Sequence, residues 1–313
     1  MRNPGRAAWH GLASWGAVVL GSLLGAALIA PWVYAGLLAV EPRLPWPFGR
    51  VFNRLAMLVL LLVLVAVRRD LGWPRWRALL SAGRPGGRWA AVGAGFAVAM
   101  VGAVLGVAWA LAAGELVPSG SDYPYLSRRT LFTLMGAFAA SFIEEGFFRG
   151  LMFPALAASL GALNGALASS ALFSLVHVFS ADRSFVWEGF SAAAGFAYLT
   201  VVAGNHAHPA VLRPLFGLFL VGVALALLVW RTGSLYLAIG LHAGWALVFQ
   251  LLRHAKWPAV HVPRGLPALA QRYFVLGQPW AWVVIGVTAA LALAWGRRLK
   301  ASAAWREAGA DDG

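Results

Sequence analysis

Long apolar stretches constrain this chain more than any other feature of its sequence. A helix needs about 20 mostly apolar residues to cross the hydrocarbon core of a bilayer. Of the 313 residues, 61% are hydrophobic and only 12% are charged, which excludes a water-soluble globule. The sequence predicts an all-α polytopic membrane protein with about eight transmembrane helices and an intramembrane polar cavity. The helices are expected at 13–40, 52–67, 89–113, 130–153, 157–179, 212–231, 234–252 and 279–296.

The sequence is interpreted as three regions. Residues 1–129 are expected to hold N-terminal transmembrane helices and loops, and 130–252 a core of helices with an inserted segment near 181–211, to which the resemblance described below assigns the catalytic role. Residues 253–313 are expected to hold a loop, the last transmembrane helix and a short polar tail. The segment 186–204 carries Glu188 among many small residues, so it is interpreted either as a span or as an interfacial or re-entrant piece.

The charge is strongly basic, with 25 Lys and Arg against 11 Asp and Glu. Most of these cations flank apolar stretches, where they orient helices and contact anionic head groups of the lipid bilayer. We therefore expect no nucleic acid partner. Cysteine is absent, which excludes disulfides and thiol catalysis. The first apolar stretch exceeds the length of a signal-peptide core, which predicts a retained helix. The number of predicted spans indicates a multi-pass protein, and the high content of Ala, Gly and Arg suggests a GC-rich bacterium, so we expect the bacterial inner (cytoplasmic) membrane.

Two adjacent carboxylates, Glu144 and Glu145, lie inside an apolar helix. A charge at the middle of a membrane helix costs about 2.5–3.5 kcal/mol on insertion scales, so such residues are functional, paired or both. Arg149 follows Glu145 at the favourable i,i+4 spacing, which predicts an internal ion pair. Glu144 lies about 100° around the helix and remains free to face another group.

Two histidines, His177 and His242, also lie in predicted membrane helices. Residues at i±4 spacing from these polar groups are mostly small, which favours close helix packing. Packing on these stripes would bring Glu144, His177 and His242 toward one interior point. Each feature alone also has a structural interpretation, as a salt bridge or a packing residue. The proposed stripes are Gly136, Ala140 and Glu144; Gly161, Gly165, Ser169, Phe173 and His177; and Ser234, Ala238, His242 and Ala246.

The three polar segments together form an ordered pattern. It reads Glu144-Glu145-Gly-Phe-Phe-Arg149, then Phe173-Ser-Leu-Val-His177, then His242-Ala-Gly-Trp-Ala246. With these residues the sequence resembles the CPBP membrane proteins, which comprise type II CAAX prenyl endopeptidases and bacterial abortive-infection proteases. The resemblance covers roughly residues 130–250. It implies an α-helical intramembrane endopeptidase that cuts a membrane-tethered protein or peptide substrate near its C-terminus.

The resemblance also implies roles for individual residues. Glu144 would activate a water molecule with help from His177, and His242 would stabilise the oxyanion or bind the same water. Glu145 and Arg149, with Phe173 as a further supporting residue, would hold the shape of the site. One position departs from the family pattern, because Ala246 stands where the family has Asn. An Asn amide can donate a hydrogen bond to an oxyanion, whereas Ala cannot.

The sequence leaves open whether the hydrolase is glutamate-dependent or metal-dependent. Glu144, His177 and His242 are acceptable ligands for Zn or another divalent metal, but no HExxH motif is present. We prefer water activated by Glu144. His206 and His208 are a weaker metal hypothesis, and Asn205 is a weaker substitute for the missing Asn.

Two other functions remain as alternatives. Ala246 is compatible with a catalytically impaired CPBP-like scaffold or immunity protein. Buried Glu and His residues are also found in proton-coupled transporters, although the sequence shows no broken-helix repeat.

Overall fold

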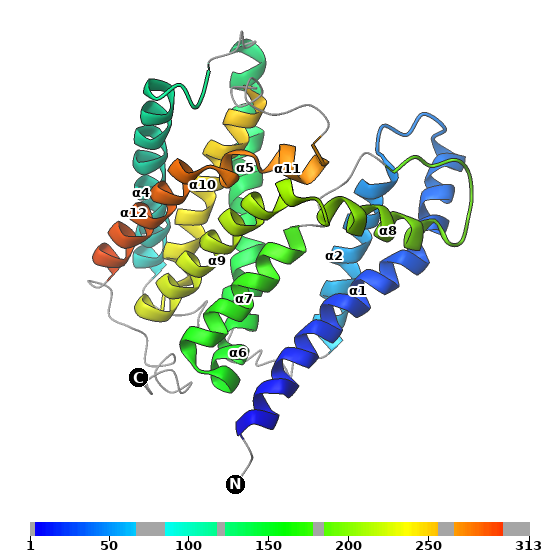
Figure 1. The fold of residues 1–313 in the computed structure, drawn as a ribbon, viewed down its shortest axis with the longest axis horizontal. Helices are drawn as coiled ribbons and strands as arrows, with labels where there is room; N and C mark the ends of the chain where they lie inside the picture. Colours follow the sequence, from blue (N-terminus) through cyan, green and yellow to red (C-terminus); the bar gives the residue numbers. More distant parts are fainter. Residues whose placement is uncertain (1–3, 67–84, 118–122, 178–184, 256–265, 297–313) are drawn as a thin grey trace.

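The structure is a computed structural model that describes residues 4–66, 85–117, 123–177, 185–255 and 266–296. The predicted polar tail lies outside the described residues. The described part is helical without strands (Figure 1). Its elements are α1 (Pro4–Val40), α2 (Phe48–Ala66), α4 (Pro85–Ala112), α5 (Tyr123–Phe147), the π-helix η1 (Phe148–Met152), α6 (Phe153–Leu160), α7 (Ala162–His177), α8 (Ala194–His206), the 3₁₀ turn η2 (Pro209–Val211), α9 (Leu212–Thr232), α10 (Leu235–His254), α11 (Ala268–Arg272), the 3₁₀ turn η4 (Val275–Gly277) and α12 (Pro279–Gly296).

Six helical stretches of the described residues are long and apolar enough to cross a membrane, so the predicted membrane fold is confirmed but the count of eight is not. The six are Ala13–Val40, Gly87–Ala112, Arg129–Leu160, Pro209–Thr232, Leu235–His254 and Pro279–Gly296. The ambiguous segment 186–204 forms a helix only from Ala194, and α8 has 13 residues. Such a helix is about 20 Å long, against about 30 Å for the hydrocarbon core, so α8 is too short for a span.

The boundary predicted between 130–153 and 157–179 is wrong. Helical structure continues from α5 through η1 and α6 to Leu160, and the break comes at Gly161, whose φ is +79°. Glycine adopts this left-handed conformation without the steric penalty of a Cβ atom. Because the chain turns there, α6 and α7 pack against each other as a hairpin, and Gly165 lies against the backbone of Ala157.

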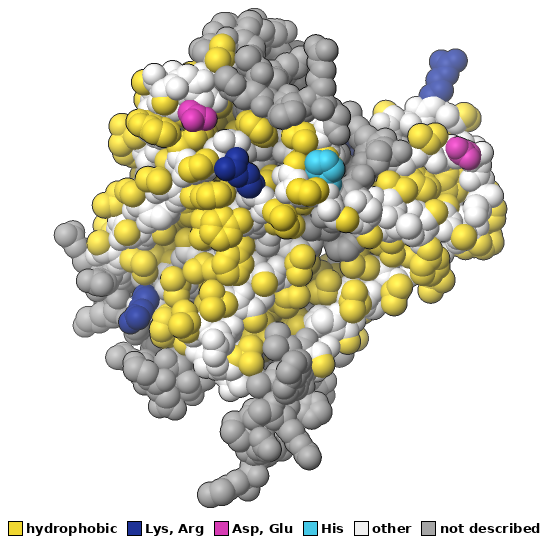
Figure 2. Space-filling view, viewed as in Figure 1, with side chains coloured by type: hydrophobic (Ala, Val, Ile, Leu, Met, Phe, Trp, Pro, Cys, Tyr) yellow, Lys and Arg dark blue, Asp and Glu magenta, His cyan; other side chains and the backbone are white. Residues whose placement is uncertain are grey.

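Apolar side chains cover most of the described surface on the face shown in Figure 2, with few charged groups among them. On α1 the exposed large residues Leu20, Leu24 and Leu28 repeat at every fourth position and form one stripe. A wide exposed apolar surface of this kind is expected where lipid, rather than water, surrounds the helices.

Helix α10 is at the centre of the bundle and packs against α4, α5 and α9 (Figure 1). Its close approach to α4 depends on glycine. A Cβ atom at Gly240 would meet the carbonyl group of Val92, and one at Gly244 would meet the Cβ atom of Ala99. The indole of Trp245 donates a hydrogen bond to the Thr288 hydroxyl at 3.1 Å, which ties α10 to α12.

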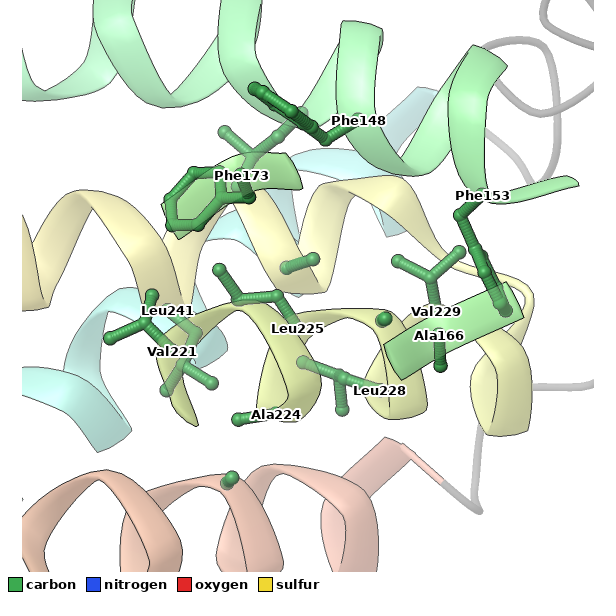
Figure 3. Packing of buried hydrophobic residues seen from close by; sticks show 14 of the residues in the cluster. Phe148, Phe153, Ala166, Phe173, Val221, Ala224, Leu225, Leu228, Val229 and Leu241 are labelled. Carbon is green, nitrogen blue, oxygen red and sulfur yellow. The ribbon is translucent and has the colours of Figure 1, made fainter. Parts of the chain in front are cut away.

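The largest hydrophobic cluster fills the space among α6, α7, α9 and α10, as Figure 3 shows for 14 of its residues. Phe148 and Phe173 meet edge to face with their ring centroids 5.1 Å apart. A second aromatic cluster, which includes Phe48, Phe52 and Tyr198, joins α1 and α2 to α8. The polar site described below lies beside the largest cluster, next to Phe148 and Phe173.

Candidate active site

The buried face of α5 differs by one residue from the stripe predicted by the sequence. Gly136 has no neighbouring atom within 4 Å of a Cβ position, and Ala140 is exposed. The buried polar and small side chains on α5 are instead Thr133, Ala137, Ser141 and Glu145. The prediction took the face with the most small residues as the packing face, whereas α5 packs through the neighbouring face, which includes Glu145. Consequently Glu145 is fully buried while the side chain of Glu144 is 30% exposed.

The predicted pairing of Glu145 with Arg149 is confirmed. The Arg149 guanidinium donates to Glu145 Oε1 at 3.0 Å, and both side chains are almost completely buried. A second nitrogen of Arg149 donates to the carbonyl oxygen of Gly222 on α9 at 3.1 Å. The guanidinium also lies over the ring of Phe173, 4.5 Å from its centroid. Arg149 therefore connects α5, α7 and α9 through charge, hydrogen bonding and ring contact.

Arg149 belongs to the π-helix η1, which interrupts the regular helix directly after the two glutamates. Single-turn π-helical segments are uncommon and occur frequently at functional sites. All five residues of η1 are buried, and Pro154 follows at the start of α6. Sequence periodicity assumed an unbroken α-helix here and did not predict this turn.

Glu145 has a second partner that the sequence did not reveal. Nδ1 of His242 lies 2.8 Å from Glu145 Oε1, so one carboxylate bridges Arg149 on its own helix and His242 on α10. A carboxylate only accepts hydrogen bonds, which places the proton of His242 on Nδ1. Residues 97 apart in sequence give no periodic signal for such a contact.

Glu144 lies between the two histidines, as the packing hypothesis predicted. Its Oε2 atom is 3.6 Å from Nε2 of His177 and 3.8 Å from Nε2 of His242. These separations exceed direct hydrogen-bond distance, and Oε2 is buried without a hydrogen-bond partner. Three helices therefore present a carboxylate oxygen and two imidazole nitrogens to one small region.

His177 is oriented by its own helix. Its Nδ1 atom lies 2.8 Å from the carbonyl oxygen of Phe173, one turn earlier, and this oxygen can only accept. The proton of neutral His177 is therefore on Nδ1. The ring of Phe173 packs at 4.3 Å from that of His177 and at 6.0 Å from that of His242, measured between centroids. Phe173 thus fixes both imidazoles and the Arg149 guanidinium, in keeping with the supporting position expected for it.

Of the weaker candidates, the side chains of Asn205 and His206 lie outside the described part of the structure. His208 accepts from the backbone of Ala210 and caps η2. Ala246 lies one turn after His242 on α10 and brings no polar atom. Within the described ranges, no group of three or more His, Asp or Glu side chains is arranged to hold a metal ion.

Fold and site together define a polytopic helical membrane protein with two carboxylates, two imidazoles and one guanidinium gathered among its helices. A family model described as "Type II CAAX prenyl endopeptidase Rce1-like" matches residues 126–248 of this chain. The matched segment contains all five of these residues, and the match confirms the resemblance predicted from the three motifs. The match shows that residues 126–248 are similar to a family of CAAX-type membrane proteases. No match to a curated protein or to a solved structure was found.

Proposed function

We propose that the protein is an intramembrane endopeptidase that hydrolyses a peptide bond of a membrane-tethered substrate with a water molecule activated by Glu144. The observation that carries the proposal is the unpartnered Oε2 atom of Glu144, which faces Nε2 of His177 and Nε2 of His242. An unpaired buried oxygen is expected to take a partner from water or substrate. Its apolar surroundings match a substrate that reaches the site from the bilayer.

The chemistry follows from the hydrogen-bonding state of each group. Glu144 and Nε2 of His177 accept the two hydrogens of the attacking water, because both present lone pairs. Glu144 takes the proton as general base while the water oxygen adds to the scissile carbonyl carbon. The same proton then passes to the leaving nitrogen, the C–N bond breaks, and a carboxylic acid and an amine result.

His242 is held by Glu145 so that Nε2 points toward the reacting region. Neutral His242 provides a second acceptor, and after protonation its Nε2–H can donate to the oxyanion. Arg149 neutralises Glu145 and stays outside the chemistry. Its hydrogen bonds and ring contacts fix the carboxylate that orients His242.

The family description and the apolar surface support a substrate class and a location. We infer that the substrate is a lipid-anchored protein or peptide cut near its C-terminus, in the bacterial inner membrane, whose anionic head groups contact the basic helix ends. Hydrolysis on this scheme needs no metal, so we expect chelators to leave activity unchanged.

The proposal is tested with purified protein in nanodiscs and a farnesylated, internally quenched CAAX peptide. The wild type should cleave it, whereas Glu144→Gln and His177→Ala should each lose about 10²–10⁴-fold, the usual contribution of general acid–base catalysis. Glu188→Gln is the matched control, because Glu188 is an exposed glutamate outside the site. Equal cleavage by Glu144→Gln and wild type would refute the assignment.

Ala246 favours one second candidate, a catalytically impaired scaffold or immunity protein on the same fold. In that case the wild type would be inactive in the nanodisc assay, and Ala246→Asn would restore cleavage.

A further inference from the structure

Among the described residues of the matched segment, the three side chains proposed for catalysis, Glu144, His177 and His242, offer an oxyanion no neutral hydrogen-bond donor. Ionised Glu144 only accepts. His177 and His242 hold their protons on Nδ1, so Nε2 of each neutral ring also accepts. Ala246 has no polar side-chain atom. Peptide hydrolysis nevertheless needs donors aimed at the charge that develops on the carbonyl oxygen, and such donors are commonly the largest single contribution to catalysis.

Tyr273 brings a hydroxyl group to this region from outside the matched segment. It directly follows α11, is partly buried, and packs against the hydrophobic cluster beside the site. Its ring meets the ring of His177 edge to face, with centroids 6.0 Å apart and an interplanar angle of 72°.

The segment that carries Tyr273 is held firmly against the helices of the site. The carbonyl oxygen of Leu276 accepts a hydrogen bond from the Trp282 indole at 2.6 Å, and the same residue packs directly on Gly217 of α9. On the other side, the Ser174 hydroxyl donates to the Leu215 carbonyl oxygen at 2.7 Å, which joins the His177 helix to α9. The segments that carry Tyr273 and His177 thus both pack against α9.

The chemistry of the phenol also suits a neutral donor. Burial, the largest influence, raises the pKa of Tyr273, the nearby charge of Glu144 raises it further, and the Arg272 and Arg253 guanidinium groups lower it in part. The balance leaves the pKa above its ordinary value of 10.0. The hydroxyl therefore keeps its proton at neutral pH and can donate it in a hydrogen bond without transferring it.

We propose that the Tyr273 hydroxyl donates a hydrogen bond to the oxyanion of the tetrahedral intermediate and so acts as a catalytic residue in place of the amide that Ala246 lacks. This inference rests on the proposed endopeptidase function. Loss of one oxyanion donor typically lowers kcat by about 10²–10³-fold. We expect Tyr273→Phe to lower kcat by that factor and to leave KM within about twofold, because the ring contact with His177 is retained.

The test measures kcat and KM for the farnesylated peptide in nanodiscs, with Tyr34→Phe as the control. The Tyr34→Phe variant also loses a phenol hydroxyl, which in the wild type donates to the Trp46 carbonyl oxygen in the distant aromatic cluster. The kcat of this control variant should equal that of the wild type. A peptidyl phosphonate, which mimics the tetrahedral state, should bind Tyr273→Phe more weakly by the same factor as kcat falls. A purely structural role for Tyr273 would not produce that match.

Asparagine at position 246 supplies an independent check. Adding Ala246→Asn to Tyr273→Phe should recover at least tenfold in kcat, whereas Ala246→Asn in the wild type should change kcat less than threefold. A large gain in the wild type would show that the site had no donor and would overturn the inference, even if Tyr273→Phe failed to fold. Unchanged kcat in Tyr273→Phe, or unchanged phosphonate binding, would also overturn it. An inactive wild type would instead refute the proposed function, and this inference with it.

Discussion

Removal of Glu145 should strongly destabilise the protein. The side chain is fully buried, and it balances the charge of Arg149, which is only 1% exposed. Breaking a buried ion pair by removing one partner costs about 3–5 kcal/mol, because the remaining charge is left uncompensated. In Glu145→Met the guanidinium would keep the Gly222 carbonyl oxygen and the rings of Phe148 and Phe173, none of which carries a compensating charge.

The size of the coupling can be derived from the contacts. Glu145→Met and Arg149→Met should each cost about 3–5 kcal/mol, so independent effects would sum to about 6–10 kcal/mol. The double variant leaves no buried charge. Its remaining losses are the unpaired Gly222 carbonyl oxygen and the unpaired Nδ1–H of His242, at about 1–3 kcal/mol each. We therefore expect a double variant only about 2–6 kcal/mol below the wild type.

The assay is an unfolding titration in mixed micelles, followed by tryptophan fluorescence for the wild type, both single variants and the double variant. Glu188→Met is the control, because it removes the carboxylate of an exposed glutamate and so shows the effect of losing an unburied charge. A double variant whose loss equals the sum of the single losses would refute the argument, since it would mean that the two charges do not compensate each other.

Three further predictions follow from neighbouring features. Glu144→Gln should abolish cleavage yet change the free energy of unfolding by less than about 1 kcal/mol, because the side chain is 30% exposed and has no short contact to lose; the same micelle titration checks this. Gly240→Val should lower the yield of folded protein on size-exclusion chromatography, because its side chain would meet the Val92 carbonyl group, whereas Gly136→Ala should leave the yield unchanged because no atom lies within 4 Å. Tyr273 should make the protein less stable at alkaline pH. Because the pKa of Tyr273 is higher in the folded protein than in the unfolded chain, its stabilising contribution is fully present below pH 10.0 and is lost as the pH rises through the folded pKa. Tyr273→Phe should remove that part of the alkaline loss, and an identical pH profile for both proteins would contradict it.

The sequence predicted the membrane fold and the polar constellation because both depend on strong local signals. Spans of apolar residues identify helices by length, and charged residues within them are costly enough to require partners. The pairing of Glu145 with Arg149 follows from i,i+4 spacing alone. The approach of Glu144 to His177 and His242 required only that the polar faces of three helices meet.

Other features depend on contacts that no local pattern encodes. The buried face of α5 was placed one residue away, because the small residues Gly136 and Ala140 were taken as a packing stripe. The bridge from Glu145 to His242 and the position of Tyr273 arise from tertiary packing of distant segments. The break at Gly161 had a local signal, a glycine between two apolar stretches, but glycine is frequent in membrane helices and the signal was not specific.

The adjacency of the two glutamates explains how one helix turn provides both a scaffold and a reactive group. Consecutive residues lie about 100° apart around a helix, so one faces the protein interior while its neighbour faces the edge of the packed surface. Glu145 on the inner face contacts Arg149 and His242 through Oε1 and fixes them, and only its fully buried Oε2 atom has no hydrogen-bond partner among the described residues. Glu144 at the edge retains an unpartnered oxygen between two imidazole nitrogens. Exchanging the roles would require rotating α5 by a quarter turn or more, which would turn the buried side chains of Ala137 and Ser141 away from the interior. The order of the pair, and not only its presence, therefore determines which carboxylate is available for chemistry.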